Sequence, residues 1–315
     1  MNASALSSPE CQGPVAITGI TGFVGRALAD RLLAAGVDVR GLVRRPDAEL
    51  PAGVQRVTGD LDAKEALDAL IADTSLVVHC AGAVRGRERA DFDRVNVAGT
   101  EALLARIGQV HPGVRLIHLS SLAARAPQLS HYAASKRAAE ALFDENTRCR
   151  WTLLRPTAIY GPGEKELAPL LQSMARGWAP TPAVDAARVT LIHIDDVIDA
   201  ILAAAASTGA QGGCFELSDA HSEGYSWDEL CLAVSALRQR KVHRIPVPVT
   251  LLAAAGRVNL ALSVLFRYAP MLSPGKAREL THPDWSCDIG PFTAASGWRP
   301  GVDLAQGLAS VLGPL

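Results

Sequence analysis

The sequence predicts an α/β fold, in which a doubly wound parallel sheet carries a smaller C-terminal lobe. Two observations support this prediction. Short apolar segments alternate with segments of helical periodicity through the first half of the chain, and a glycine-rich turn follows the first apolar segment, at Thr18-Gly-Ile-Thr-Gly-Phe-Val-Gly25. Such alternation is typical of a parallel sheet covered by helices on both faces, with its ligand at the carboxyl ends of the strands.

The expected elements can be placed in order along the chain. The first strand covers residues 15–17, and the helix after it spans residues 26–35, where Gly36 is the kind of residue that commonly ends a helix. Further strands are predicted at residues 37–43, 54–57, 76–80, 115–119 and 151–154. Helices are predicted between them at residues 64–71, 96–110 and 132–145.

The bulk composition argues against several classes of protein. The 315 residues are 49% hydrophobic and 20% charged, which suits a soluble α/β protein with an ample core. A formal net charge of -1 gives no long-range attraction to nucleic acid, so no nucleic-acid partner is expected. The six cysteines form no C-x-x-C pair, no histidine spacing indicates a metal site, and residues 1–13 lack the pattern of a signal peptide. A reducing, cytoplasmic location is therefore expected.

The glycine-rich turn predicts a dinucleotide site. Gly19, Gly22 and Gly25 stand where a strand gives way to a helix. Because these residues lack side chains, the backbone can approach a pyrophosphate, which the helix N-terminus then stabilises. A tight turn without a ligand is the alternative, and the strand–turn–helix context makes it the weaker one.

The second strand bears on which dinucleotide binds. Such folds usually place an Asp or Glu about 20 residues after the turn, where it holds the ribose 2′-hydroxyl. Here the strand ends without an acid and carries Arg40, Arg44 and Arg45 instead. A guanidinium suits a 2′-phosphate through its charge and its paired donors. We therefore expect NADP(H) to be favoured over NAD(H), with Arg44 as the first candidate; solvated surface arginines are the alternative.

A catalytic pair is predicted downstream, at Tyr132-Ala-Ala-Ser-Lys136. Side chains four residues apart lie on one face of a helix. The ammonium of Lys136 would then favour the phenolate and lower the pKa of Tyr132 below its usual value of about 10. This spacing is common by chance, and it is the glycine turn upstream that gives it chemical meaning.

Further motifs follow at regular intervals along the chain. In order they are Gly59-Asp-Leu61, Val77-Val-His-Cys-Ala-Gly82, Asn96-Val-Ala-Gly-Thr100, Ser120-Ser121, Arg155-Pro-Thr-Ala-Ile-Tyr-Gly-Pro-Gly163, His193-Ile-Asp-Asp-Val197 and Ser296-Gly-Trp-Arg-Pro300. Their order and spacing resemble those of the extended short-chain dehydrogenases/reductases, the NAD(P)-dependent epimerase/dehydratase family. The resemblance covers residues 15–312, implies a Rossmann-type fold, and is nearest to the 3β-hydroxysteroid dehydrogenase and dihydroflavonol reductase branch.

The resemblance implies a role for individual residues. Tyr132 would be the general acid/base, Lys136 would bind the nicotinamide ribose and lower the Tyr132 pKa, and Ser121 would hydrogen-bond the reacting oxygen. Asn96 is implied as a supporting catalytic residue, and Tyr160 would belong to the segment lining the nicotinamide end. The cofactor-binding residues implied are Gly19, Thr21, Gly22, Phe23, Val24, Gly25, Arg44, Asp60, Leu61, Ala81, Gly82, Tyr132, Lys136 and Pro156. These roles suit hydride transfer, in which the substrate oxygen needs a proton partner and a second hydrogen-bond donor.

The second half of the chain is expected to alternate between the sheet and the lobe. Residues 189–194 are predicted to return to the sheet as a strand, followed by a helix over 196–206 and a late strand over 215–218. The Rossmann domain is therefore assigned to residues 14–163 with 189–218, the substrate lobe to 164–188 and 219–315, and a flexible tail to 1–13. Ser226 and Glu229 have the spacing of a capping box, and His193 is predicted to be structural.

The apolar run over residues 246–268 has several interpretations. A core or dimer helix is favoured, and an apolar substrate lid or a helix on a membrane surface is the alternative. The run is interrupted by Pro248, Arg257 and Asn259 and falls short of a clean membrane span. Membrane contact is therefore not expected, whereas a homodimer through two sheet-flanking helices is what the family resemblance implies.

Three functions remain open from the sequence. The first is an NADP(H)-dependent alcohol dehydrogenase or ketone reductase that acts on a mostly apolar small molecule. The second is a nucleotide-sugar epimerase or dehydratase with tightly bound NAD, although the short segment between Ser121 and Tyr132 departs from many such enzymes. The third is a non-catalytic NADP-sensing or assembly protein, against which the intact Ser121, Tyr132 and Lys136 argue.

Overall fold

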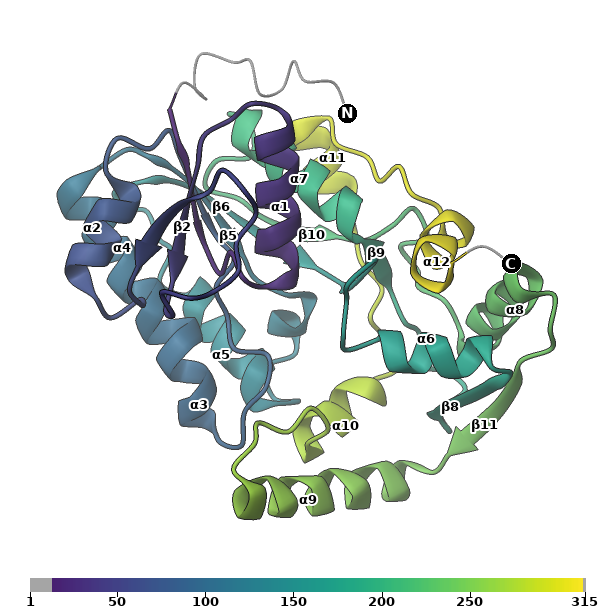
Figure 1. Cartoon of the computed structure of the whole chain (residues 1–315). Coiled ribbons are helices and arrows are strands. Elements are labelled where there is room, and N and C mark those ends of the chain that lie inside the picture. Colours follow the sequence, from purple (N-terminus) through teal and green to yellow (C-terminus); the bar gives the residue numbers. More distant parts are fainter. Residues whose placement is uncertain (1–12, 314–315) are drawn as a thin grey trace.

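The computed structural model describes residues 13–313, so the predicted flexible tail lies, except for Gly13, outside the described residues. Seven parallel strands form the central sheet in the order β10-β6-β5-β4-β1-β2-β3 (Figure 1). They are β1 (Val15–Thr18), β2 (Val39–Val43), β3 (Gln55–Thr58), β4 (Leu76–His79), β5 (Arg115–Leu119), β6 (Arg150–Pro156) and β10 (Cys214–Leu217). The order runs outward from β1 in both directions, which confirms the doubly wound α/β fold.

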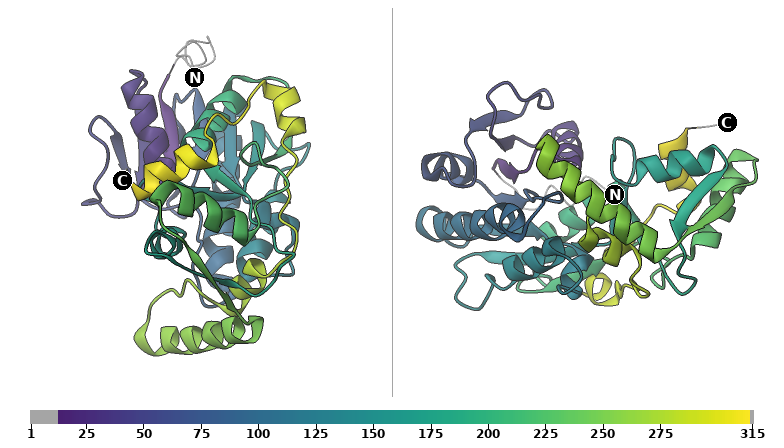
Figure 2. Two further views of the ribbon diagram at one scale, coloured as in Figure 1. Left: turned by 90° about the vertical axis from the view of Figure 1, so that its right-hand side faces the viewer. Right: turned by 90° about the horizontal axis from the view of Figure 1, so that it is seen from below.

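Helices cover both faces of this sheet (Figures 1 and 2). One face carries α1 (Phe23–Ala34), α7 (Ile194–Ala206) and α11 (Gly290–Ser296), and the other carries α2 (Lys64–Ile71), α4 (Gly99–Val110) and α5 (His131–Glu140). Successive residues of β1 alternate between the two cores: Val15 and Ile17 pack beneath α1, and Ala16 packs beneath α2 and α4. The central strands β1 and β4 are buried along their whole length and are mostly apolar, which explains why the sequence reveals them so clearly, whereas the edge strand β3 is mostly exposed.

One predicted strand does not join the sheet. β9 (Leu191–His193) pairs with β7 (Ala158–Tyr160) in a separate two-stranded sheet, so the prediction that residues 189–194 return to the main sheet is wrong. The reason is that β7 begins two residues after β6 ends and carries the chain away from the sheet, and β9 follows this extension. The return is made instead by β10, which lies at the edge beside β6.

The C-terminal lobe is built on a small parallel pair of strands, β8 (Trp178–Pro182) and β11 (His243–Val247). Around this pair lie α6 (Ala168–Ala175), α8 (Trp227–Arg238) and α12 (Leu304–Leu312). The predicted capping box opens α8: the Glu229 amide donates to Ser226 Oγ at 3.2 Å, and the Glu229 carboxylate accepts from the Ser226 amide at 2.7 Å.

The apolar run forms a long helix, α9 (Val249–Phe266), which is followed by α10 (Pro274–Leu280). Figure 1 shows α9 along the lower edge of the molecule, where it spans from the lobe towards the sheet domain. Only Gly256 and Ser263 of α9 are buried, so the helix is not part of the core. Among the described residues it is the one helix whose length and composition would allow it to cross a membrane.

Candidate active site

The glycine turn lies at the carboxyl end of β1, at the start of α1. Gly19 has φ +71°, and a Cβ there would meet the backbone of Ala81 at 2.6 Å. A Cβ on Gly25 would collide with the carbonyl oxygen of Gly19, so the turn and α1 can approach each other only without side chains. Gly22 caps α1 without any side-chain hydrogen bond, which leaves the amides of the first helical turn available to an anion. The predicted pyrophosphate cradle therefore fits.

The other predicted residues of this turn differ in exposure. Thr21 is exposed and Phe23 is half-buried, so both can face a bound nucleotide. Val24 packs into the core beneath α1, which leaves only its backbone for that role. The loop after β4 brings Gly82 close to the catalytic side: a Cβ on Gly82 would lie 3.7 Å from Lys136 Nζ.

The three arginines of β2 do not share one environment. Arg40 donates to the carbonyl oxygens of Ala69, Leu70 and Ala72 at 2.7–3.2 Å and so closes the C-terminal end of α2. Arg44, which directly follows β2, is exposed, as is Arg45. Arg40 is therefore structural, and the arginines after the strand remain the candidates for a 2′-phosphate.

Asp60 and Leu61 follow β3 at the same edge of the sheet. Asp60 is exposed, and its carboxylate accepts from the Asp62 amide at 3.1 Å. Leu61 is half-buried and packs against Gly99, where a Cβ would collide with it. The adenine contact of Asp60 stays a prediction, while Leu61 fills the space between its loop and α4.

The proposed catalytic residues meet at the start of α5. Ser130 caps this helix by accepting from the Ala133 amide at 2.9 Å, which places Tyr132 in the first turn. Ser121 caps a short 3-10 helix, Leu122–Arg125, and its side chain hydrogen-bonds the Tyr132 hydroxyl. The structure thus brings the serine and the tyrosine together.

Lys136 lies one turn further along α5 and is buried. Its Nζ donates to the Leu119 carbonyl at the end of β5, at 2.7 Å. Burial lowers the lysine pKa from 10.5 to about 8, although the nearby Glu140 carboxylate opposes this effect. Two buried histidines, His79 and His118, lie close enough to feel the ammonium, and burial together with that charge lowers their pKa values. On the side where His79 and His118 lie, Lys136 is therefore surrounded by neutral groups.

The pKa of Tyr132 moves opposite to the sequence-based prediction. Burial raises it to about 12, the hydrogen bond with Ser121 lowers it in part, and the charge of Glu279 raises it further. The prediction that Lys136 makes the tyrosine more acidic is therefore wrong for this structure. Burial of the hydroxyl is the largest cause of the raised pKa, since a phenolate loses its hydration there. At neutral pH Tyr132 is a proton donor.

Asn96 links two of the segments that form the site. It is buried within a π-helical turn, Arg94–Ala98, between α3 (Arg89–Asp93) and α4. Its amide accepts from the Ala83 amide at 2.7 Å and donates to the Ala83 carbonyl at 3.1 Å and to Ser135 Oγ at 2.8 Å. With both donors and its acceptor in use, Asn96 fastens the loop after β4 to α5. These contacts position that loop, and the catalytic role of Asn96 stays a prediction.

Glu140 is a buried carboxylate that supports α5, and no role was predicted for it from the sequence. Glu140 accepts from Ser120 Oγ at 2.6 Å and from Arg155 through two hydrogen bonds, at 2.8 and 2.6 Å. This arrangement ties α5 to the ends of β5 and β6. The signal for it was present, because Glu140 stands four residues after Lys136 on the same face of the helix.

Glu279 reaches the site from the lobe and had no signal in the sequence. It is buried on α10, where it accepts a hydrogen bond from Ser130 Oγ and another from Lys276 Nζ at 3.0 Å. Its charge acts on Tyr132. The lobe therefore contributes directly to the electrostatics of the catalytic tyrosine.

Residues of other motifs are buried, and the predicted cofactor contact of Pro156 stays a prediction. Pro156 is buried at the end of β6, in register with Leu217 of β10. Tyr160 is 1% exposed and packs in the core of the lobe, so the prediction that it lines the nicotinamide end is wrong. His193 caps α7 and contacts Ser310 Oγ at 3.1 Å, in agreement with its predicted structural role. Within residues 13–313 no group of three or more His, Cys, Asp or Glu side chains could hold a metal ion.

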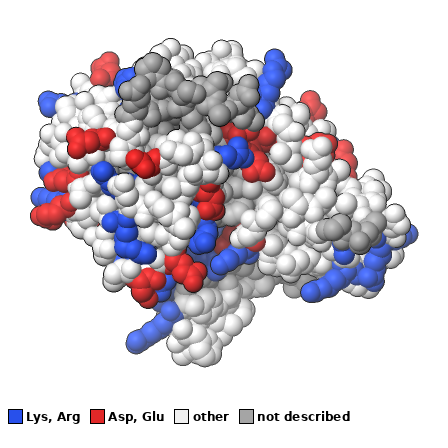
Figure 3. Space-filling view, turned by 45° about the horizontal axis from the view of Figure 1, so that its top comes forward, with Lys and Arg blue, Asp and Glu red and all other residues white. Residues whose placement is uncertain are grey.

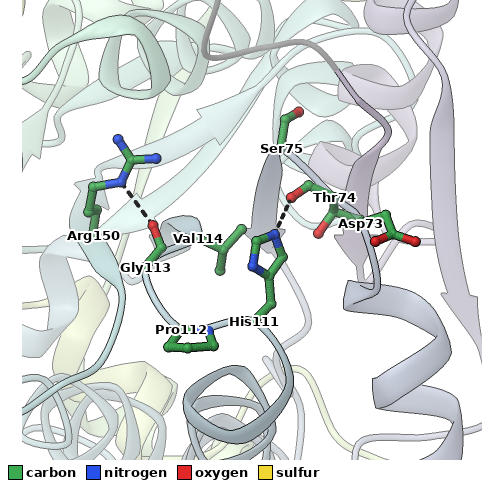
Figure 4. Close-up of a pocket in the computed structure, with 8 residues that line it drawn as sticks. All are labelled: Asp73, Thr74, Ser75, His111, Pro112, Gly113, Val114 and Arg150. Atoms are coloured by element: carbon green, nitrogen blue, oxygen red, sulfur yellow. Dashed lines mark hydrogen bonds between the residues drawn. The ribbon is translucent and has the colours of Figure 1, made fainter.

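A pocket of about 480 Å³ lies elsewhere on the molecule (Figure 4). It opens at the amino ends of β4, β5 and β6, the edge of the sheet opposite to the glycine turn. Its polar groups bind one another: His111 contacts the Thr74 carbonyl at 2.9 Å, and Arg150 donates to the Gly113 carbonyl at 2.9 Å. Because ligands of doubly wound sheets bind at the carboxyl ends, this pocket is not the active site.

A glycine cradle that admits a pyrophosphate, with Ser121, Tyr132 and Lys136 at the carboxyl edge of the same sheet, defines a nicotinamide-dependent enzyme of the short-chain type. The pattern of the NAD dependent epimerase/dehydratase family matches residues 15–217. The chain belongs to this family, which confirms the resemblance seen in its motifs and makes it an NAD(P)-dependent enzyme of the oxidoreductase superfamily.

Individual relatives include reductases. A ceramide reductase from Caulobacter vibrioides is 37% identical over 286 residues, which cover 90% of this chain and 89% of that protein. The 4-hydroxy-2-methyl-3-oxo-4-farnesyl-3,4-dihydroquinoline-1-oxide ketoreductase from Stigmatella aurantiaca is 31% identical over 231 residues, 64% of this chain and 67% of that protein. The structure of MoeE5 in complex with UDP-glucuronic acid and NAD has the same fold, with a TM-score of 0.73, 20% identity and coverage of 95% and 97%.

Proposed function

We propose that this protein is an NADPH-dependent ketone reductase whose substrate is a ceramide-like lipid with a ketone in place of a hydroxyl. The observation that carries this proposal is the Ser121, Tyr132 and Lys136 site in a chain that is 37% identical to a ceramide reductase over nine-tenths of its length. A reductase whose product is a ceramide must act on a carbonyl of the long-chain backbone. The substrate is thus apolar around its reacting carbon.

The residues divide the chemistry as follows. Bound NADPH would supply the hydride that reaches the carbonyl carbon. Tyr132 holds the proton that the carbonyl oxygen takes, and the Ser121 hydroxyl donates a hydrogen bond to the charge that develops on that oxygen. Lys136 would hold the nicotinamide ribose through its ammonium, which burial has brought to a pKa of about 8.

The raised pKa of Tyr132 keeps its hydroxyl in the protonated form, which is the form that reduction requires. With a pKa of about 12, the hydroxyl keeps its proton across the physiological range and is ready to donate it. The opposite direction needs a phenolate at the outset, which burial and the charge of Glu279 disfavour. The ring centroid of Phe92 lies 6.3 Å from that of Tyr132, so an apolar side chain adjoins the catalytic tyrosine.

Two exposed arginines support the choice of NADPH. Arg44 and Arg45 follow β2 at the edge where the cofactor ribose is expected, and no acid stands there to hold a 2′-hydroxyl. A ketone reductase oxidises NADPH in every turnover, so a cofactor that is exchanged agrees with this activity. An epimerase returns its hydride to the substrate, so a tightly retained cofactor would suit that activity instead.

Absorbance at 340 nm tests the proposal directly. The purified protein is mixed with NADPH or NADH and with three substrates: a ceramide-like ketone in detergent micelles, a steroid ketone and a UDP-sugar. Oxidation of NADPH by the lipid ketone, at a rate above that with the other two, supports the proposal. Turnover with the steroid alone would redirect it to another apolar ketone, and no oxidation with any ketone would overturn it.

The nucleotide-sugar epimerase remains the second candidate, because the fold is shared with enzymes that bind UDP-sugars and NAD. It predicts protein that purifies with tightly bound NAD and that converts a UDP-sugar without net change at 340 nm. Cofactor extraction followed by chromatography distinguishes the two. A non-catalytic sensor, the third candidate, predicts that Tyr132→Phe leaves every function of the protein intact.

A further inference from the structure

The long helix α9 contacts the protein mainly along one side. Gly256 and Ser263 are buried there and Asn259 between them is half-buried, as are the apolar residues Leu252, Ala253 and Leu260. A Cβ on Gly256 would lie 2.9 Å from the backbone of Ser273, and the Asn259 amide donates to the Leu272 carbonyl at 2.8 Å. Small and polar groups thus make the contact with the segment that leads to α10.

The rest of the α9 surface is largely apolar and open. Its large exposed side chains are Val249 (42%), Leu251 (59%), Val258 (59%), Leu262 (42%), Val264 (61%), Leu265 (72%) and Phe266 (67%). A helix on the surface of a water-soluble domain has the reverse pattern, with its apolar stripe towards the core. An exposed apolar surface of this kind marks a site that another surface covers.

The charges on and near α9 indicate which kind of surface would cover it. From Leu230 to Arg278 the sequence has eight Lys and Arg and no Asp or Glu, and two of the eight, Arg244 and Lys276, pair with carboxylates outside this stretch. Arg257 within α9 and Arg267 at its end are exposed, and neither pairs with a carboxylate among residues 13–313. The chain as a whole is nearly neutral, so this segment is locally basic. Apolar side chains interspersed with arginines complement an anionic lipid surface.

The connections at the two ends of α9 determine how the helix would be oriented at a membrane. The helix begins directly after β11 of the lobe, and seven residues after its end α10 begins. α10 is held at the active site by the hydrogen bond between Glu279 and Ser130. Both ends of α9 therefore return to one folded body. The right-hand view of Figure 2 shows the helix lying across that body, which suits a helix parallel to the membrane and not one across it.

A second copy of the chain suits this face less well. In a symmetric dimer the same residues meet on both sides, so Arg257 and Arg267 of each copy would face a basic surface. The homodimer that the family resemblance implies would form through two sheet-flanking helices, which α9 is not among. Figure 3 shows few charged side chains at the lower end of the molecule, where α9 lies.

We propose that α9 docks the protein onto an anionic lipid membrane, with its outward apolar side chains in the interface and its arginines at the headgroups. This inference goes beyond the proposed reductase activity and does not depend on it. The sequence alone ranked membrane contact below a core or dimer helix; the burial of Gly256 and Ser263, with the exposure of the leucines, reverses that order.

Vesicle flotation tests the docking. The full chain is mixed with vesicles of phosphatidylcholine alone, or with roughly three parts in ten phosphatidylglycerol, and the floating fraction is measured. We expect binding to the anionic vesicles, at least about tenfold weaker binding to the neutral ones, and loss of binding in about 0.5 M NaCl. The variant Leu265→Ser with Phe266→Ser should bind the anionic vesicles about tenfold less or worse.

A matched control keeps the test specific. Val110 and Leu232 are also large and exposed, at 39% and 68%, but lie on α4 and α8. Val110→Ser with Leu232→Ser should leave flotation unchanged, and urea unfolding should show that both variants fold. The proposal would be overturned if the wild-type protein did not float with the vesicles. A change from dimer to monomer in the α9 variant would indicate that α9 is a dimer interface instead. Resistance to alkaline carbonate extraction would also overturn the proposal, in favour of a membrane-spanning helix.

Discussion

Lys136 carries its charge inside the protein, and that charge is expected to make the ligand-free protein less stable. The side chain is buried, and burial lowers its pKa from 10.5 to about 8. A lowering of that size corresponds to about 3.5 kcal/mol, at about 1.4 kcal/mol for each unit of pKa. The hydrogen bond from Nζ to the Leu119 carbonyl offsets about 1 kcal/mol. Lys136→Met should therefore raise the free energy of unfolding at pH 7 by about 2.5 kcal/mol.

The pH dependence of this effect has a definite sign. Between about pH 8 and pH 10.5 the unfolded chain keeps a proton on Lys136 that the folded protein releases, so wild-type stability rises with pH in this window. The advantage of Lys136→Met should shrink over the same window. Cysteines and tyrosines that titrate there are common to both proteins and cancel in the difference.

Urea unfolding at pH 7 and at pH 10 measures both effects. Lys136→Arg is the matched control, since arginine keeps its charge at either pH and should gain nothing as the pH rises. A methionine variant less stable than wild type at pH 7 would refute the reasoning. So would a stability difference that stays constant from pH 7 to pH 10, because the lysine would then have an ordinary pKa in the folded protein.

Three further changes test the cofactor and proton sites. Gly25→Ala should weaken NADPH binding at least about tenfold because its Cβ meets the Gly19 carbonyl, whereas Gly22→Ala should be milder; equal affinities by fluorescence titration would contradict the cradle. Arg44→Ala should raise the KM for NADPH about tenfold and leave that for NADH unchanged; steady-state rates showing no change in either would remove the 2′-phosphate role. Glu279→Gln should move the alkaline limb of the kcat/KM profile to lower pH, because its charge raises the pKa of Tyr132; a limb that stays in place or moves upward would exclude that influence.

Much of the fold could be predicted because the sheet is buried on both faces. Strands such as β1 and β4 are then apolar up to their last residue, and the helices between them show one apolar side. The glycine turn was predictable for a related reason: Gly19 and Gly25 sit where backbone meets backbone, so no other residue fits. The prediction that residues 189–194 return to the main sheet was wrong because nothing in the sequence of that strand distinguishes pairing with β6 from pairing with β7.

The site was predictable where neighbours in the chain make it, and not where the lobe contributes. Tyr132 and Lys136 share a helix, so their proximity follows from their spacing. The pKa of Tyr132 does not, since it depends on the burial of the hydroxyl and on Glu279 from a distant helix. The inward side of α9 was visible in principle, because Gly256, Asn259 and Ser263 recur at helical spacing. Only the structure showed which side faces water.

The central claim is that Tyr132 delivers a proton to a lipid ketone. Single-turnover oxidation of bound NADPH by the ceramide-like ketone, followed at 340 nm in wild type and Tyr132→Phe, tests it most directly. The account predicts that the rate falls at least about 100-fold, while fluorescence titration gives the same Kd for NADPH because the ring is retained. A variant that turns over at the wild-type rate would contradict the assignment of Tyr132 as the proton donor.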